Sequence, residues 1–282
     1  MHPPVDTKDP KAVAAEVRSA YDAILPAGDA QFISRAFEWA EDYFNGRYDD
    51  YQPIDVPYHD FEHTLQGTLC MARILRGWHE AGPTPHLTQE MVELGLLAIL
   101  MHDTGYLKRR DDTEGTGAKY TAIHVRRSAE FAERFLREKG FNATQITAVR
   151  NMIQCTGLGN TVSEIPFQSE LERILGHALG TADLLGQMAA NDYIQKLPEL
   201  FREFREAAAW SKGKEHLVAN YESVDDLIRR TPGFWDTFVR PKLERDFGAI
   251  YRYLHHPFPD GPNFYLERIR RNMDQLRHRF EA

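Results

Sequence analysis

The feature that most constrains the fold of this chain is an apolar run that ends in two strongly polar residues. Residues 91–101 read MVELGLLAILM, and His102 and Asp103 follow at once. A helix of this composition belongs in a protein interior, where unpaired polar groups are costly. Coordination of a cation by the pair would offset that cost, so the run predicts a buried metal site at its end. We assign five residues to this one site: His59, His63, His102, Asp103 and Asp183.

The remainder of the sequence predicts an all-α protein. We find no convincing run of alternating β-branched residues, whereas apolar residues recur at helical spacing, as at Phe61, Leu65 and Leu69. The 282 residues leave room for one large domain, or for one domain with a helical extension. Helices are expected over roughly 11–24 and 30–45, after His59 up to a break within 77–85, over 89–103 with Gly105 as its C-terminal cap, over 119–138, from Asn142 onward, and over 168–190.

The charge balance and the cysteines limit the classes of function. The net charge of -8 argues against nucleic acid or an anionic membrane as the main partner. Only Cys70 and Cys155 are present, so no disulfide framework is implied and a reducing compartment fits. The first residues contain no apolar signal region, and no apolar run reaches transmembrane length. We therefore expect a cytoplasmic protein with no nucleic-acid and no membrane partner.

The spacing of the candidates supports one shared site. If His59 and His63 both lie in the first turns of a helix, their separation of four residues puts them on one face. Neighbours within a continuous helix point about 100° apart, so His102 and Asp103 can share an ion only where the helix ends. Asp183 lies in a helix of small and aliphatic residues, where a buried carboxylate needs a partner or a cation. The alternative for Asp183 is an ordinary surface position.

His124 has two interpretations. It shares a helix face with Ser128, Phe131 and Phe135, so it points into the protein. It is either a core histidine or a part of the site, and the spacing does not choose between them. Cys155 ends a later helix and is expected to be a small buried residue.

At these positions the chain resembles the HD superfamily of metal-dependent phosphohydrolases. The order His63, His102-Asp103, Asp183 matches that family. Residues 58–63, YHDFEH, are similar to the Tyr-His-Asn-x-x-His signature of the cyclic-nucleotide phosphodiesterase-like branch. Further segments that resemble the family are 97–106, 124–129, 153–156 and 182–186, so the likeness covers about residues 31–190.

The resemblance implies an all-α HD-domain core with a divalent metal ion at its centre. It implies His63, His102, Asp103 and Asp183 as the metal ligands, with His59 as the catalytic proton donor and Asp103 as both ligand and catalytic residue. Such a set suits Mn, Fe, Co, Ni or Zn better than Mg alone. His124 would contact phosphate or a second ion bridged by Asp103. Residues 142–156 contain no histidine, so a complete second metal site is not expected.

The expected organisation is a helical lead-in over 1–30, the HD core over 31–190, and a helical extension over 191–282. We expect that extension to pack on the core and to wall the pocket or to form a homodimer surface. The expected function is metal-dependent hydrolysis of a phosphate monoester or diester, with a small phosphorylated substrate such as a nucleotide or cyclic nucleotide. The alternatives are an HD-fold di-iron oxygenase and a non-catalytic metal-binding regulatory module. The sequence assigns no substrate-binding residue.

Overall fold

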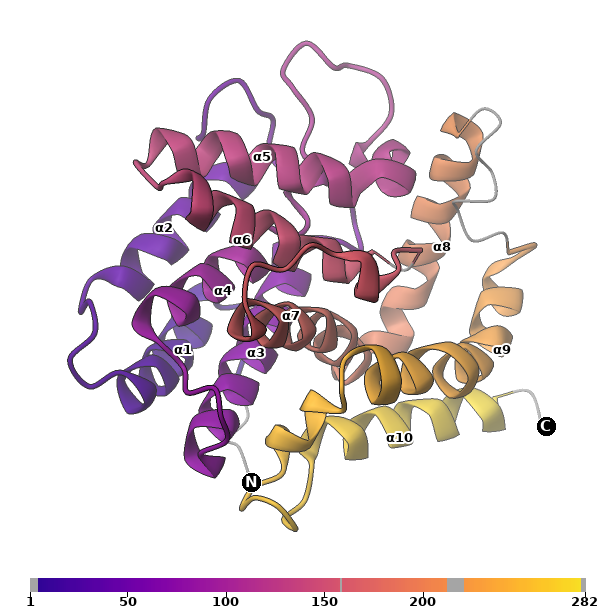
Figure 1. Cartoon of the computed structure of the whole chain (residues 1–282). Coiled ribbons are helices and arrows are strands. Elements are labelled where there is room, and N and C mark those ends of the chain that lie inside the picture. Colours follow the sequence, from indigo (N-terminus) through magenta and orange to yellow (C-terminus); the bar gives the residue numbers. More distant parts are fainter. Residues whose placement is uncertain (1–4, 158, 212–220, 280–282) are drawn as a thin grey trace.

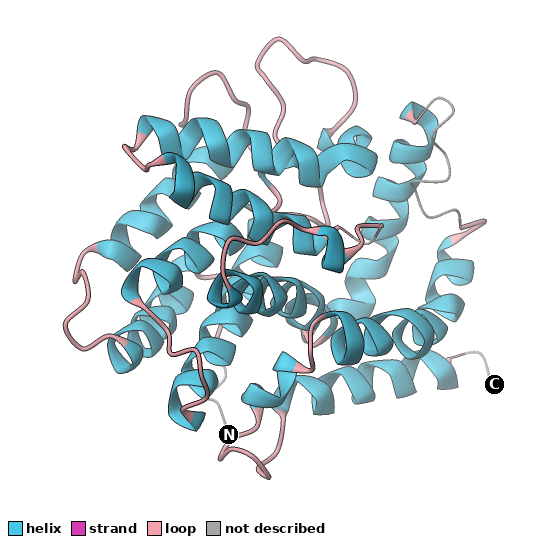
Figure 2. Cartoon of the chain, viewed as in Figure 1, coloured by secondary structure: helices cyan, strands magenta, loops and turns pink. Residues whose placement is uncertain are grey.

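The computed structural model describes residues 5–157, 159–211 and 221–279. All regular secondary structure in these residues is helical, with isolated bridges in place of strands (Figure 2), which confirms the all-α prediction. The α-helices are α1 (Pro10–Ile24), α2 (Phe32–Phe44), α3 (Phe61–Ala81), α4 (Gln89–Met101), α5 (His124–Glu138), α6 (Ala143–Ile153), α7 (Glu170–Met188), α8 (Tyr193–Trp210), α9 (Val224–Phe234) and α10 (Phe264–His278). The 3-10 turns are η1 (Thr104–Tyr106), η2 (Gly117–Ile123), η3 (Gln154–Thr156), η4 (Val162–Glu164) and η8 (Ile250–Leu254), and η6 (Trp235–Val239) and η7 (Lys242–Asp246) are π-helical.

Helix α7 runs through the middle of the molecule (Figure 1) and packs on α3, α4, α6 and α10. Its close approach to α3 depends on glycine. A Cβ atom at Gly186 would lie 2.8 Å from the backbone carbonyl of Gln66 and 2.9 Å from the amide nitrogen of Gly67. A larger residue at position 186 would therefore push the two helices apart. This crossing brings His63, near the start of α3, beside Asp183 on α7.

The start of one predicted helix is confirmed, and the end of another is wrong. Helix α3 begins at Phe61, after His59, because Asp60 caps it by accepting a hydrogen bond from the backbone N–H of His63. His59 therefore does not share a first turn with His63. Helix α4 ends at Met101, and Gly105 lies beyond it in η1 rather than at its cap. A Cβ atom at Gly105 would lie 2.0 Å from the carbonyl oxygen of His124, so glycine here serves close packing against α5.

The C-terminal helices share the hydrophobic core of the others. Buried Leu197, Ile269 and Met273 belong to the same apolar cluster as α1 to α7. The side-chain amide of Asn272 donates to the backbone carbonyls of Met188 (2.9 Å) and Ala190 (3.2 Å), which fixes α10 at the end of α7. The division at residues 30 and 190 stays a prediction. Within the described residues, no helix combines the length and apolar character needed to cross a membrane.

Candidate metal centre

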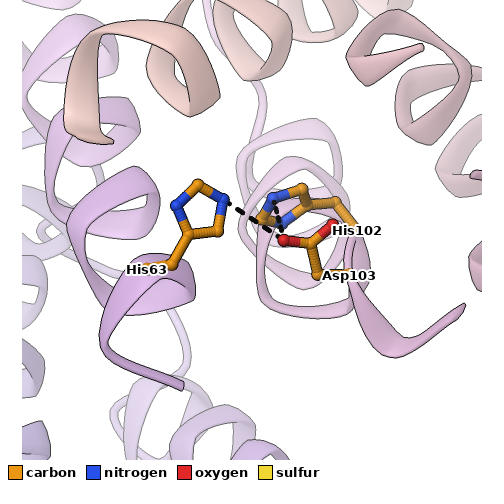
Figure 3. Close-up of side chains that lie close together, drawn as sticks. All are labelled: His63, His102 and Asp103. Carbon is orange, nitrogen blue, oxygen red and sulfur yellow. Dashed lines mark ion pairs between the residues drawn. The ribbon is translucent and has the colours of Figure 1, made fainter. Parts of the chain in front are cut away.

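Four side chains converge from three helices that are far apart in the sequence. His63 lies in the first turn of α3, His102 caps the C-terminus of α4, Asp103 follows it, and Asp183 lies on α7. Figure 3 shows His63, His102 and Asp103 pointing toward one another. The backbone leaves helical geometry at Asp103 (φ -107°, ψ 7°), which lets its carboxylate turn back beside His102. The structure therefore brings together the four residues expected to be ligands.

The distances between the imidazole nitrogens and the carboxylate oxygens fit coordination of one cation, and among the described residues the group with all ligand atoms within 4.8 Å of one another is His63, His102 and Asp103. His63 Nε2 lies 3.2 Å from Asp103 Oδ2 and 3.1 Å from Asp183 Oδ1. His102 Nε2 lies 3.3 Å from the same Asp103 oxygen and 3.4 Å from the same Asp183 oxygen. Metal bonds of about 2.1 Å place neighbouring ligand atoms about 3.0 Å apart at right angles and about 3.4 Å apart in a tetrahedron. All four side chains are buried, and Asp103 and Asp183 also line a cavity.

The hydrogen bonds at the site also favour a cation. Asp103 Oδ2 and His102 Nε2 are buried and make no hydrogen bond with the described residues. His102 Nδ1 lies 2.7 Å from the carbonyl oxygen of Ile99 and donates its proton there. This bond keeps a proton on Nδ1, so that Nε2, once it loses its own proton to a bound cation, directs a lone pair at the cluster, as in known metal-binding histidines.

The pKa values describe a cluster that needs positive charge. Burial alone would lower the pKa of His63, but contacts with Asp103 and Asp183 raise it to about 9. The pKa of His102 is also raised, because the same carboxylates outweigh its burial. Burial acts to raise the pKa of Asp103 and of Asp183, but the two imidazoles hold both below the usual range. Without a cation, protons on the two imidazoles thus balance the negative charge of the two buried carboxylates.

His59 reaches the site from the loop before α3, and Glu203 of α8 holds it there. His59 Nδ1 lies 2.5 Å from Glu203 Oε2, while Glu203 Oε1 accepts hydrogen bonds from the backbone N–H groups of Tyr58 (2.6 Å) and His59 (3.2 Å). The Glu203 side chain is only 1% exposed. A buried carboxylate that faces Nδ1 fixes the proton on that nitrogen, which leaves Nε2 as the free edge of the ring.

Tyr106 lies between two histidines. Its ring stacks on His59 and on His124, each at 4.7 Å between centroids and 17° between planes. His124 donates from Nδ1 to the carbonyl oxygen of Thr121 (2.7 Å), and its Nε2 lies 3.9 Å from Asp103 Oδ1. This is the Asp103 oxygen that faces away from His63 and His102. Burial lowers the pKa of His124, which favours a neutral ring.

A cavity of about 160 Å³ adjoins these residues. His59, Asp103, His124 and Asp183 line it on the side of the metal cluster. The C-terminal helices α8 and α9 supply an apolar wall, and its residues include Leu197, Leu200, Phe204, Leu227 and Phe234. Thr156 of η3 also lines the cavity, whereas Cys155 is a buried core residue.

The charged loop after Asp103 was a candidate source of positive charge for a phosphate, but its cations do not line the cavity. Lys108 pairs with Asp55 at 2.9 Å, Arg109 with Asp49 at 2.7 Å, and Arg110 with Asp50 at 3.7 Å. The ammonium of Lys119 contacts the carboxylate of Asp112. These cations secure the loop to its neighbours and are not among the residues that line the cavity.

Sequence reasoning missed Glu203 and Tyr106. Glu203 lies in the segment FREFREAAAW, where nothing distinguishes it from the neighbouring Glu199 and Glu206. Its partner His59 is 144 residues away, so only the fold reveals the pair. A weak signal for Tyr106 was its position three residues after Asp103, at the end of the apolar run.

Comparison with known proteins gives a family but no activity. Residues 111–255, just over half of the chain, match the Npun_R2479-like family. The match includes His124, Asp183 and Glu203, and it begins after His102 and Asp103. No curated protein matches the sequence. The chain belongs to the Npun_R2479-like family.

Proposed function

We propose that this protein is a metal-dependent phosphohydrolase that cleaves a phosphate monoester or diester, with a nucleotide or cyclic nucleotide as its substrate. The observation that carries the proposal is the convergence of His63, His102, Asp103 and Asp183, whose ligand atoms lie 3.1 to 3.4 Å apart across the imidazole–carboxylate pairs. The resemblance of these residues to the HD superfamily supports the same assignment.

The donor set suits one divalent cation. Two imidazoles favour Mn, Fe, Co, Ni or Zn over Mg alone, because Mg prefers oxygen ligands. Such a cation would supply a Lewis acid for the phosphoryl oxygens and a source of acidified water. The protein holds its ligands rigidly through the α3–α7 crossing and the bond from His102 to Ile99.

His59 is the proposed proton donor to the leaving oxygen. Glu203 holds Nδ1–H and stabilises the charged imidazolium, so the proton on Nε2 can pass to the leaving oxygen as the P–O bond breaks. Tyr106 keeps the ring plane in place by stacking on it. His124, on the outer side of Asp103, would donate to or coordinate the phosphate group.

The cavity walls suit a substrate with an apolar, planar part. Phe204, Tyr221 and Phe234 line the side contributed by the C-terminal helices. An aromatic wall beside a cation site matches the two parts of a nucleotide, because a base stacks on rings and a phosphate binds the metal. Both cysteines are free and buried, which fits the cytoplasmic location that we propose. A homodimer stays a prediction.

The di-iron oxygenase is the second candidate, and one observation favours it. Asp103 Oδ1 faces His124 at 3.9 Å while Oδ2 faces the other two histidines, which is the arrangement of a bridging carboxylate. Two irons per chain with a visible absorption band, and no phosphate release from any ester, would favour the oxygenase. Bound metal with neither activity would favour a regulatory module.

The test combines metal analysis with hydrolysis assays. Purified protein should contain about one equivalent of a transition metal, and it should release phosphate or alcohol from nitrophenyl phosphates, nucleotides or cyclic nucleotides in the presence of Mn, Co, Ni or Zn. Asp103→Asn should remove both the metal and the activity. Asp22→Asn, an exposed residue on α1, is the matched control and should keep both. Full metal occupancy in the Asp103→Asn variant would overturn the ligand assignment.

A further inference from the structure

A second cavity lies away from the metal centre and is larger, about 810 Å³. The segment around η4, the first half of α7 and the π-helical η7 surround it. It shares no lining residue with the metal cavity, although α7 contributes His177 to one and Asp183 to the other. A cavity of this volume lies within the usual range of small-molecule sites, about 300–1,000 Å³.

Lys242 lines this cavity and lacks an adequate partner. Its side chain is 6% exposed, and its ammonium makes no hydrogen bond with the described residues. The carboxylate within 4 Å is that of Asp246, at 3.9 Å, and Asp246 is itself 47% exposed to water. The rings of Phe238 and Phe247 lie 5.8 and 5.3 Å from the ammonium. The ammonium is not among the fully enclosed polar atoms without a partner, so it keeps some access to the cavity and still has donors to give to an anion.

His177 is the second buried polar group at the cavity. It is 7% exposed, and neither ring nitrogen makes a hydrogen bond with the described residues. Its ring contacts Phe167 and Phe247. Burial lowers its pKa to about 4, so the ring is neutral near pH 7 and can either donate or accept a hydrogen bond.

The charge around the cavity is positive. Arg173 already pairs with Glu170. Arg245 is exposed and has no ion pair among the described residues, so Lys242 and Arg245 together exceed the single charge of Asp246. The opposite walls are apolar and include Val162, Ile165 and Phe167.

We propose that this cavity is a binding site for a small organic anion, whose phosphate or carboxylate group contacts Lys242 and Arg245 while its apolar body packs on Phe167 and Phe238. The site is separate from the proposed metal centre and goes beyond the proposed function. His177 provides a neutral hydrogen bond to the same ligand. A charge-assisted hydrogen bond from a buried ammonium is a strong contact, so Lys242 is the residue on which affinity should depend most.

The test is isothermal titration of the full chain with two probes that share one ring. Benzylphosphonate carries the phosphate-like group and phenylacetate carries the carboxylate, while benzyl alcohol is the uncharged comparison. At least one anion should bind with a Kd below about 1 mM and well ahead of the alcohol. The better probe identifies which of the two anionic groups the site prefers.

Two variants and a control locate the binding. Lys242→Met removes the charge at similar length and should weaken binding about tenfold or more. Arg245→Gln, at an exposed position, should weaken it about threefold, and it remains a usable test if Lys242→Met does not fold. Lys11→Met, on exposed α1 surface, should bind like the wild type.

Three results would overturn the proposal. In the first, neither anion binds better than benzyl alcohol. In the second, affinity stays within twofold of the wild type in the folded variants at positions 242 and 245. In the third, binding is lost in Asp103→Asn but unchanged in Lys242→Met, which would place the probe at the metal centre.

Discussion

Replacement of Glu203 by glutamine tests whether His59 acts as a proton donor. The carboxylate of Glu203 accepts three hydrogen bonds: from His59 Nδ1–H and from the backbone N–H groups of Tyr58 and His59. The glutamine carbonyl oxygen can still accept from the two backbone groups. Its NH₂ group, however, then faces Nδ1 of His59. Because two donors cannot share a hydrogen bond, Glu203→Gln disfavours the imidazolium that the mechanism requires.

The expected loss of activity is large, and the expected loss of stability is small. Proton transfer by a positioned side chain contributes about 10²- to 10⁴-fold to a rate, so kcat should fall by a factor in that range. Stability should fall by about 1–3 kcal/mol, because one charge-assisted bond of Glu203 is lost and the buried backbone groups keep their acceptor. Metal content should stay at the wild-type value, since Glu203 does not contact the cluster of His63, His102 and Asp103.

The assay is steady-state hydrolysis of the best ester, together with metal content and thermal melting. Glu199→Gln is the control on the same helix, because within the described part of the chain Glu199 pairs with nearby Arg202 on the surface. In a His59→Ala background, Glu203→Gln should add almost no further loss, because both changes remove one function. A Glu203→Gln variant with kcat within threefold of the wild type, or one that loses its metal, would refute the role assigned to the pair.

Three further predictions concern the metal cluster, the helix crossing and the second cavity. Because the pKa of His63 is raised to about 9 and that of His102 is also raised, each imidazole should be positively charged at pH 7 before metal binds; calorimetry in buffers of different ionisation enthalpy should show about two protons released per metal bound, and release near zero would contradict the raised pKa values. Gly186→Ala should destabilise the protein by about 1–3 kcal/mol in a urea titration and should weaken metal binding. Gly233→Ala, with open space around an added Cβ atom, is the control and should change neither. The pKa of His177 is lowered from 6.5 to about 4 in the fold, so its contribution to stability is complete above pH 6.5 and is lost as the pH falls toward 4, by up to about 3 kcal/mol. His177→Gln should therefore flatten the dependence of unfolding free energy on pH between 6.5 and 4. An unchanged slope would contradict this prediction.

The residues whose surroundings are local could be predicted from the sequence. The apolar run before His102 requires burial wherever the helix lies, and the polar pair at its end must then be satisfied. The helix cap at Asn142 could also be predicted, because the capping box with Gln145 is formed within four residues. A helix after His59 was also predicted, but the role of Asp60 as its cap, which accepts a hydrogen bond from the His63 amide, was not.

Contacts between distant segments could not be predicted in this way. Lys108 reads as a solvated loop cation, but it is buried and donates to Asp55 and to the carbonyl of Gly115. Its burial depends on where residues 51–56 pass, which no local pattern encodes. The same holds for Lys242, which is buried because a π-helical turn directs it toward Phe247 and the cavity.

The position of Glu203 changes how the C-terminal extension is understood. Considered as a sequence, residues 191–282 hold no candidate ligand and could be an appendage that merely covers apolar surface. In the fold, α8 supplies the carboxylate that orients His59, and α8 and α9 supply the apolar wall of the cavity. The proposed metal ligands all precede residue 190, so the segment supplies none of them. It holds the neighbouring His59 through Glu203. The proposed metal binding and the proposed proton donation thus depend on different parts of the chain, and loss of the second should leave the first intact.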